Sequence, residues 1–174
     1  PYRDPEKDVV DPYITLMDNI EIISHHGFQG KRDLRKNSRF LVAGGGMAGV
    51  CAALAAARHG AKVALVQNRS RLGGNASSEV RMHIVGADHH GHRSGWREGG
   101  IIEELRIEDA ANNPHWSWEL WDLLLYDKVI SEPNITLLLD TDIYAATVEN
   151  DRIVEALARC DSTEHIYRIQ AKQY

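Results

Sequence analysis

Three glycines give this sequence its clearest chemical signal. Gly44, Gly46 and Gly49 stand in the spacing G-x-G-x-x-G. The first permits a tight turn, the second lets a phosphate approach the backbone because it has no side chain, and the third lets a helix pack closely on a sheet. A helix that begins here would attract phosphate through its free N–H groups and its dipole. The spacing therefore predicts a site for the phosphates of a dinucleotide.

The segments around these glycines have the patterns that such a site requires. Residues 40–43 are an apolar run that predicts a buried parallel strand. Residues 47–59 are rich in alanine, which favours a helix, and Gly60 suits its end. Residues 62–67 predict a second strand. A glycine-rich turn that binds nothing is the alternative, but a complete strand–turn–helix–strand unit favours the dinucleotide site.

The end of the second predicted strand carries Gln67. Dinucleotide-binding folds usually have an aspartate or glutamate here, which binds a ribose hydroxyl. The amide of a glutamine can donate and accept hydrogen bonds to ribose, but it adds no negative charge. Gln67 therefore argues against a purely NAD-type site.

A second glycine element follows, Arg71-Leu72-Gly73-Gly74. Together with the first, it resembles the flavin-binding superfamily of two-dinucleotide-binding-domain flavoproteins. The continuation GGNASSEVRMHIVGADHHG, and then GWREGGIIEEL, is similar to the FAD-dependent oxidoreductase family, and the similarity extends over residues 39–174. This resemblance implies that FAD is the cofactor.

The same resemblance implies which residues hold FAD. The glycine triplet would hold the pyrophosphate, Gln67 the adenosine ribose, and residues 71–75 would line the path toward the flavin. Backbone atoms near Asp142 and Ile143 would lie close to the adenine. The complete set of predicted cofactor-binding residues is Gly44, Gly46, Met47, Ala48, Gly49, Gln67, Asn68, Arg71, Gly73, Gly74, Asn75, Ser77, Asp142 and Ile143.

Two charged side chains between apolar neighbours are the candidate catalytic residues. Val80, Met82 and Ile84 alternate with polar positions that include Arg81 and His83. This alternation predicts a strand with one apolar and one charged face. One interpretation is a polar edge that faces solvent. The other places Arg81 and His83 beside the flavin, where a cation would stabilise the reduced anionic ring and the imidazole would transfer protons near neutral pH.

Three histidines, His89, His90 and His92, cluster in a glycine-rich segment. A metal site needs three or four ligands at fixed geometry, which this spacing does not arrange. We therefore expect no metal and interpret the segment as a loop near the substrate entrance. Ser77 and Ser78 lack the spacing of a hydrolytic nucleophile, and we expect them to bond phosphate or backbone.

Two helices are expected before the next strand. Apolar spacing and acidic residues near the start predict a helix over residues 100–112. Asn113 and Pro114 suit an N-cap and a first helical position, so a second helix is expected from there to about residue 130. Trp118 and Trp121 are interpreted as core packing, with a substrate platform as the alternative.

The remaining residues predict strands. Residues 134–139 are expected to continue the parallel sheet. Residues 142–149, 152–159 and 165–170, joined by turn sequences, predict an antiparallel three-stranded meander. In the superfamily that the chain resembles, such a meander is the crossover between the third and fourth parallel strands.

The predicted fold class is therefore α/β, a Rossmann-like FAD-binding domain with a parallel sheet and a meander crossover. We expect residues 39–174 to form this domain incompletely, because the second flavin-contacting segment and the substrate domain of the resembling family are not among them. Residues 1–38 are expected to form an N-terminal arm, with a β-hairpin over residues 13–24, and a charged linker.

Composition limits the partners. The net charge is −5, from 20 basic and 25 acidic side chains, and no dense basic block suggests nucleic acid as a partner. The apolar stretches are too short to span a membrane, and the two cysteines do not make a disulfide framework. We expect a cytoplasmic protein with a small-molecule substrate, and the sequence leaves a homo-oligomer open.

Three functions are compatible with these features. The first is the FAD-binding portion of an oxidoreductase that transfers a hydride or an electron pair between a small organic substrate and the flavin. The second is an NAD(P)-dependent enzyme, which the Arg-x-Gly-Gly element and the meander disfavour. The third is a nucleotide-binding module without catalysis, since we expect residues 1–174 alone to lack turnover.

Overall fold

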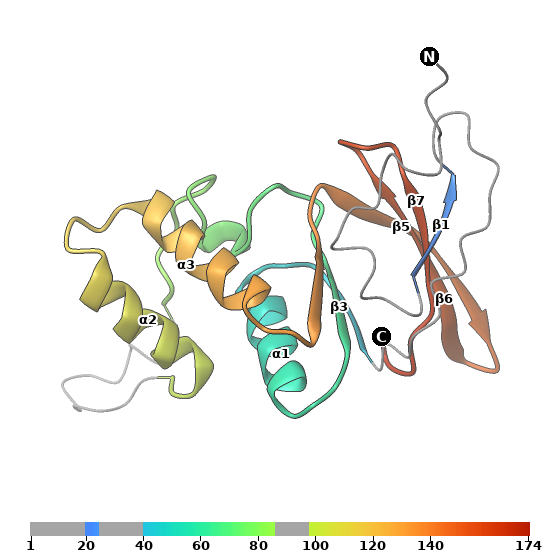
Figure 1. Ribbon diagram of the computed structural model, residues 1–174, viewed down its shortest axis with the longest axis horizontal. Coiled ribbons are helices and arrows are strands. Elements are labelled where there is room, and N and C mark those ends of the chain that lie inside the picture. Colours follow the sequence, from blue (N-terminus) through green and yellow to red (C-terminus); the bar gives the residue numbers. More distant parts are fainter. Residues whose placement is uncertain (1–19, 25–39, 86–97) are drawn as a thin grey trace, which may run out of the picture.

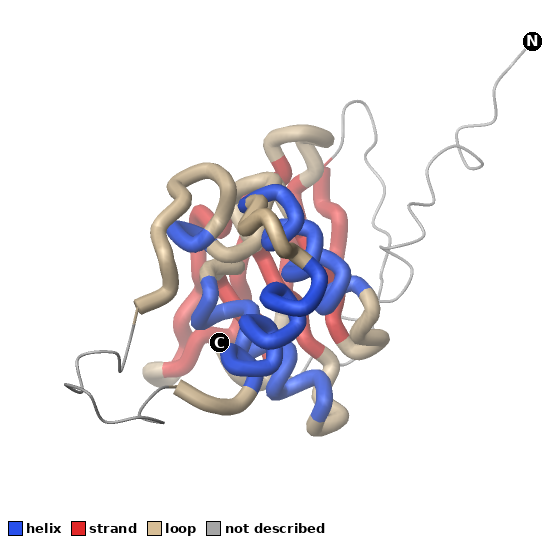
Figure 2. Tube along the Cα trace, turned by 90° about the vertical axis from the view of Figure 1, so that its left-hand side faces the viewer, coloured by secondary structure: helices blue, strands red, loops and turns tan. Residues whose placement is uncertain are grey.

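The computed structural model describes residues 20–24, 40–85 and 98–174. In this part of the chain, helices cover one face of a parallel sheet, and an antiparallel sheet lies against its other face (Figure 1). Figure 2, turned by a quarter, looks onto the helices with the strands behind them. The predicted α/β architecture, a parallel sheet followed by an antiparallel meander, is confirmed.

The parallel sheet has the strand order β2-β3-β4. Its strands are β2 (Phe40–Ala43), β3 (Val63–Val66) and β4 (Ile135–Leu138), all close to their predicted bounds. Every residue of β3 is buried. This is the pattern of a central parallel strand whose two faces are both covered.

Helix α1 (Met47–Arg58) joins β2 to β3, as expected. His59 is its C-cap residue, and Gly60 follows with φ +83°, a left-handed conformation that glycine adopts without steric cost. The face of α1 that packs on the sheet contributes Val50, Ala53, Leu54 and Ala57 to the core.

Helices α2 (Ile101–Asn112) and α3 (Trp118–Ile130) lie side by side next to α1 (Figure 1). The first was predicted almost to the residue. Ion pairs tie the three helices together: Arg58 of α1 forms two hydrogen bonds of 2.7 and 2.8 Å with Glu104 of α2, and Lys128 of α3 reaches the same carboxylate at 3.5 Å.

The predicted start of the second helix at Asn113 is wrong. Asn113 is instead the C-cap of α2, and its side chain is bonded to Asp109 Oδ1 (2.9 Å) and to the backbone N and O of Ser117 (2.8 Å each). Ser117 is the N-cap of α3, where its hydroxyl accepts a hydrogen bond from Leu120 N. The amide of Asn113 thus stabilises the turn between the helices, and a serine provides the cap.

The antiparallel sheet has the order β1-β7-β6-β5. The three predicted meander strands are β5 (Thr141–Glu149), β6 (Arg152–Cys160) and β7 (Ile166–Ile169). Asn150 and Asp151, both with positive φ, form the tight turn between the first two.

Residues 20–24 form β1 (Ile20–Ser24), which pairs antiparallel with β7. The rest of the predicted N-terminal hairpin, residues 13–19, lies outside the described residues. After β7 the chain returns to the free edge of β2, where Leu41 N donates to Gln173 O (2.9 Å) and Phe40 makes a parallel bridge to Gln173. The meander therefore leads back to the parallel sheet, as a crossover does.

The strand predicted over residues 79–84 is wrong. After the short 3₁₀ helix η2 (Gly74–Ala76), the backbone N of Val80 and of Arg81 both donate to Ser77 O. Arg81 has φ +60°, and the side chains of Val80 and Met82 are 47% and 57% exposed. A period-two alternation indicates a strand only if another strand pairs with it, and here local turn bonds determine the backbone.

No helix in the described part of the chain is both long and apolar enough to cross a bilayer.

Candidate cofactor site

The glycine turn lies at the carboxyl end of β2. Gly44 has φ +105° and donates its N–H to Val66 O (2.8 Å), which closes the turn onto β3. A Cβ on Gly49 would overlap the carbonyl oxygen of Gly44, so the third motif glycine lets α1 approach the turn itself. A Cβ on Gly46, by contrast, would meet no described atom within 4 Å. Gly46 therefore exposes backbone to open space, as a phosphate site requires.

Helix α1 begins directly after this open position. Gly46 is its N-cap, and within the described residues its first turn has neither a side-chain cap nor an acidic residue. Met47 and Ala48, both predicted to bind the cofactor, are in that turn. The start of α3 differs, because Ser117 caps it and Glu119 follows. An uncapped helix N-terminus beside a glycine is suited to bind a phosphate.

The second glycine element packs directly on the first. Gly73 N donates to Gly45 O (2.8 Å), Gly73 bridges to Gly46, and a Cβ on Gly74 would lie 3.2 Å from the Cα of Gly46. Gly73 and Gly74 have φ of +99° and +59°. The structure thus brings the two predicted glycine elements into one site. Sequence reasoning missed Gly45, whose Cβ would lie 2.6 Å from Leu72 Cδ2; the run of three glycines was its only signal.

Gln67 holds these two elements together. The residue is 4% exposed, its Oε1 accepts a hydrogen bond from Gly45 N (2.8 Å), and its Nε2 donates to Arg71 O (2.9 Å). Both ends of the amide are therefore engaged within the protein. The predicted contact with ribose stays a prediction, and the structure gives Gln67 a second task that the sequence did not reveal.

Arg71 forms an ion pair with α3. Its guanidinium lies 3.4 Å from Oδ2 of Asp122, whose other oxygen accepts a hydrogen bond from Ser78 N (3.0 Å). The Asp122 side chain is 5% exposed and that of Arg71 48%. Asp122 is 51 positions after Arg71 in the sequence, so no local pattern could have linked them.

The other predicted cofactor residues lie next to Gln67 and the second glycine element in the sequence or at the start of β5. Asn68 and Asn75 are exposed, while Ser77 is buried and its hydroxyl donates to Gly74 O (2.7 Å), a bond to backbone as expected. Thr141 N donates to Gln67 O (2.9 Å), which places the start of β5 against the end of β3. Asp142 and Ile143 directly follow Thr141 in β5.

The predicted catalytic residues lie in the turn after η2. Arg81 donates to Ser78 O (3.2 Å) and pairs with Glu119 of α3 at 3.3 Å, so its charge is partly compensated. A hydrogen bond from the Ser117 hydroxyl lowers the pKa of Glu119, and Arg81 adds to this effect. The His83 ring lies against Trp118 with ring centroids 5.3 Å apart.

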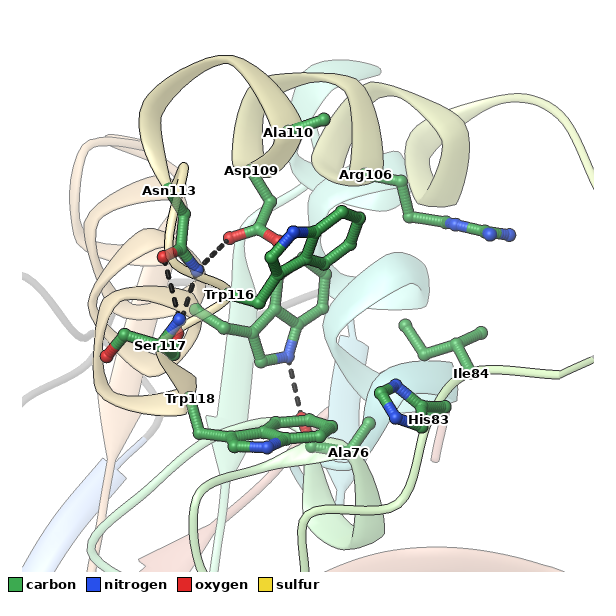
Figure 3. Close-up of a pocket in the computed structure, with 11 residues that line it drawn as sticks. Ala76, His83, Ile84, Arg106, Asp109, Ala110, Asn113, Trp116, Ser117 and Trp118 are labelled. Atoms are coloured by element: carbon green, nitrogen blue, oxygen red, sulfur yellow. Dashed lines mark hydrogen bonds between the residues drawn. The ribbon is translucent and has the colours of Figure 1, made fainter.

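His83 also lines a cavity of about 340 Å³ between α2, the start of α3 and residues 83–84 (Figure 3). In that view Trp116 lies above, and Trp118 and His83 lie below. Trp121, whose side chain is buried, donates its indole N–H to Ala76 O (2.6 Å). Trp121 is in the core and Trp118 packs against it, as expected, and both also line this cavity. The lining residues are Ala76, His83, Ile84, Arg106, Asp109, Ala110, Asn113, Trp116, Ser117, Trp118 and Trp121.

No group of three or more His, Cys, Asp or Glu side chains that could hold a metal ion occurs in residues 20–24, 40–85 and 98–174. His89, His90 and His92 lie outside the described residues, so the expectation that they bind no metal stays a prediction. Cys51 and Cys160 are free cysteines, and burial raises the pKa of the Cys51 thiol.

Comparison with known proteins is consistent with this geometry. Residues 40–174 match the family model described as FAD dependent oxidoreductase. The crystal structure of THI4 from Thermovibrio ammonificans aligns with a TM-score of 0.52 and 17% identity over 78% of this chain and 55% of that one. A glycerol-3-phosphate dehydrogenase from Bacillus halodurans, complexed with FAD, aligns with a TM-score of 0.48 and 15% identity over 79% of this chain and 33% of that one.

The chain thus spans between a third and just over half of the length of these two structures. At such identities the likeness to THI4 concerns the fold alone, and the second alignment is too weak to carry an argument. No protein with a curated description matches the chain.

Proposed function

Because the chain belongs to the FAD dependent oxidoreductase family, we propose that it is the FAD-binding portion of an oxidoreductase that transfers a hydride or an electron pair between a small organic substrate and the flavin. FAD, when bound, supplies the redox chemistry, and the protein supplies binding, orientation and electrostatics. This activity is proposed for the whole protein. We also propose that its substrate is a small molecule and that it is cytoplasmic, and a homo-oligomer is compatible with this function.

One observation carries this proposal: the open backbone at Gly46 leads straight into the uncapped start of α1. The phosphates of FAD would fit there, because a Cβ on Gly46 meets no described atom within 4 Å and the first N–H groups of a helix attract phosphate. Gly73 and Gly74 of the second glycine element line the same place. An NAD(P) cofactor would use the same helix end, so this geometry alone favours a dinucleotide, and family membership favours FAD.

We infer the direction of the bound cofactor from the neighbours of this turn. Asp142 follows Thr141, the first residue of β5, whose N–H donates to Gln67 O, so this side suits the adenosine half. Residues 75–83 extend the second glycine element and suit the flavin half. There Arg81 would hold positive charge near the ring, and the His83 imidazole would hold or release a proton.

Titration of the full chain with FAD and with NADH, followed by fluorescence, tests the proposal. We expect saturable binding of FAD, a weaker response to NADH, and loss of FAD binding in Gly46→Val, whose branched side chain would fill the phosphate approach. Tighter binding of NADH than of FAD would refute the FAD assignment. Binding without turnover in the complete protein would favour the nucleotide-binding module.

The catalytic assignment needs a separate measurement. In the complete protein, Arg81→Ala and His83→Ala should slow flavin reduction without changing FAD affinity. Unchanged rates of flavin reduction in both variants would refute the catalytic role of Arg81 and His83 and leave them only a structural role in the turn after η2.

A further inference from the structure

The cavity of Figure 3 has polar groups that no described residue bonds. Asn113 and the Trp121 indole are fully engaged by protein partners. Arg106, in contrast, makes no hydrogen bond or ion pair with any described residue, and neither does the imidazole of His83. Asp109 accepts a hydrogen bond from Asn113 Nδ2 on one oxygen (2.9 Å), and no described residue bonds its other oxygen. The wall thus offers both hydrogen-bond donors and acceptors to a ligand.

The charges of this wall balance. Arg106 and Asp109 both line the cavity from α2, three positions apart on the same helix face, yet they form no ion pair with each other. An anionic ligand would be attracted by Arg106 and repelled by Asp109, and a cation would experience the reverse. A neutral ligand that both donates and accepts hydrogen bonds is compatible with both side chains.

The remaining wall is aromatic. Trp116 is 74% exposed, although a large apolar side chain is usually buried, and it lies across the cavity from Trp118 and His83 (Figure 3). An indole face provides broad apolar contact with little loss of side-chain entropy. Since Asn113 bonds both Asp109 and the backbone of the segment that carries Trp116, the polar and aromatic walls are held in fixed relation.

We propose that this cavity binds a neutral, polyhydroxylated ring, the chemistry of a monosaccharide. Its C–H face would lie on the indole of Trp116 or Trp118, and its hydroxyls would accept from Arg106 and donate to Asp109. A volume of about 340 Å³ is within the range of small-molecule sites.

The cavity shares one structural element with the proposed FAD site. Gly74, at one end of η2, packs against Gly46, and Ala76, at the other end, lines the cavity and accepts the bond from Trp121. A ring bound here would therefore be next to the flavin half of the cofactor. That this ring is the substrate rests on the proposed function, whereas its binding in the cavity does not.

Calorimetry and ligand-observed NMR on the full chain test the proposal, with D-glucose, D-galactose, D-xylose and D-mannose as probes. Benzoate and choline serve as an anionic and a cationic comparison. The variants are Trp116→Ala, Arg106→Gln and Asp109→Asn. Leu123→Ala is the matched control, because this exposed side chain on α3 does not line the cavity. FAD is titrated into every variant.

We expect at least one of the sugars to bind with a millimolar dissociation constant. Trp116→Ala should weaken binding about tenfold, and Arg106→Gln and Asp109→Asn about threefold each, as the loss of stacking area or of one hydrogen bond implies. The control should change nothing, and all variants should keep the FAD affinity of the parent chain.

Three results would overturn the proposal. The first is the absence of saturable binding by all four sugars. The second is binding of benzoate, weakened only by Arg106→Gln, which would identify an anion site. The third is binding of choline, weakened only by Asp109→Asn, which would identify a cation site. Sugar binding in a chain that fails to bind FAD would refute the proposed function and leave this inference intact.

Discussion

Replacement of Gln67 by methionine would separate the two tasks that this side chain could have. Methionine has a similar length and fills the same buried space, but it makes neither of the hydrogen bonds to Gly45 N (2.8 Å) and Arg71 O (2.9 Å). If Gln67 holds the two glycine elements together, Gln67→Met destabilises the protein even without cofactor. If it serves only as a ribose ligand, the apoprotein is unaffected.

The magnitude follows from the burial of the two partners. Gly45 is buried, so its orphaned N–H should cost roughly 1–3 kcal/mol, whereas the carbonyl of the exposed Arg71 can turn to water and should cost only about 0.5 kcal/mol. The sum is roughly 1.5–3.5 kcal/mol of unfolding free energy. For a chain of this size it corresponds to a fall in Tm of about 3–14 °C.

Thermal unfolding of the apoprotein, followed by circular dichroism, measures this effect. Asn68→Ala is the control, because Asn68 is the next residue, is exposed and was also predicted to bind the cofactor. We expect it to change the stability of the apoprotein by less than about 0.5 kcal/mol. An unchanged Tm for Gln67→Met, with reduced FAD affinity, would refute the structural role.

The remaining predictions concern three other contacts. Gly46→Ala should leave the Tm of the apoprotein nearly unchanged but weaken FAD binding, because its Cβ meets no described atom within 4 Å. Gly49→Ala should lower the Tm of the apoprotein, because its Cβ overlaps the carbonyl oxygen of Gly44. Equal changes of the two variants in Tm and in FAD affinity would contradict this. Asp122→Asn should lower the Tm of the apoprotein, because the buried carboxylate pairs with the arginine of the second glycine element; an unchanged Tm would contradict it. The hydrogen bonds from Arg58 lower the pKa of Glu104 below its ordinary 4.5, so the stability that Glu104 adds is complete above that pH and is lost as the pH falls through the lowered value. The difference in unfolding free energy from Glu104→Gln, below about 1 kcal/mol for this exposed pair, should therefore vanish in acid.

The elements that could be predicted from the sequence are those that local patterns determine. The glycine turn, the buried strand Val63–Val66 and the meander each have a short-range signature of spacing, apolar run or turn residues. The start of α3 was misplaced because asparagine and serine are both good N-caps, and residue type alone does not show that the Asn113 side chain instead bonds Asp109 and the backbone of Ser117. The strand expected around Arg81 failed because alternation does not supply a pairing strand.

In the candidate site too, some features follow from local sequence patterns and others depend on contacts in the folded chain. Its glycines were predictable because each needs a particular backbone conformation, which the motif encodes. The roles of Gly45, Gln67 and Asp122 were not, because each depends on a partner that only the folded chain brings near. The cavity at Trp116 was equally hidden, since its walls come from three separate segments.

The arginines near the second glycine element do not face the solvent as free charges. Each lies 3.3–3.4 Å from a carboxylate: Arg69 from Glu79, Arg71 from Asp122 and Arg81 from Glu119. Because these charges are partly compensated, their net attraction for a pyrophosphate is reduced. We therefore expect recognition of the phosphates to depend chiefly on backbone N–H groups at the start of α1, next to the turn that the Gln67 amide bonds at Gly45. An acid at position 67 would have put a buried negative charge beside those phosphates, and it could not have donated to the Arg71 carbonyl. The glutamine that argued against NAD in the sequence is thus compatible with the phosphate site that we propose, and it bonds both glycine elements.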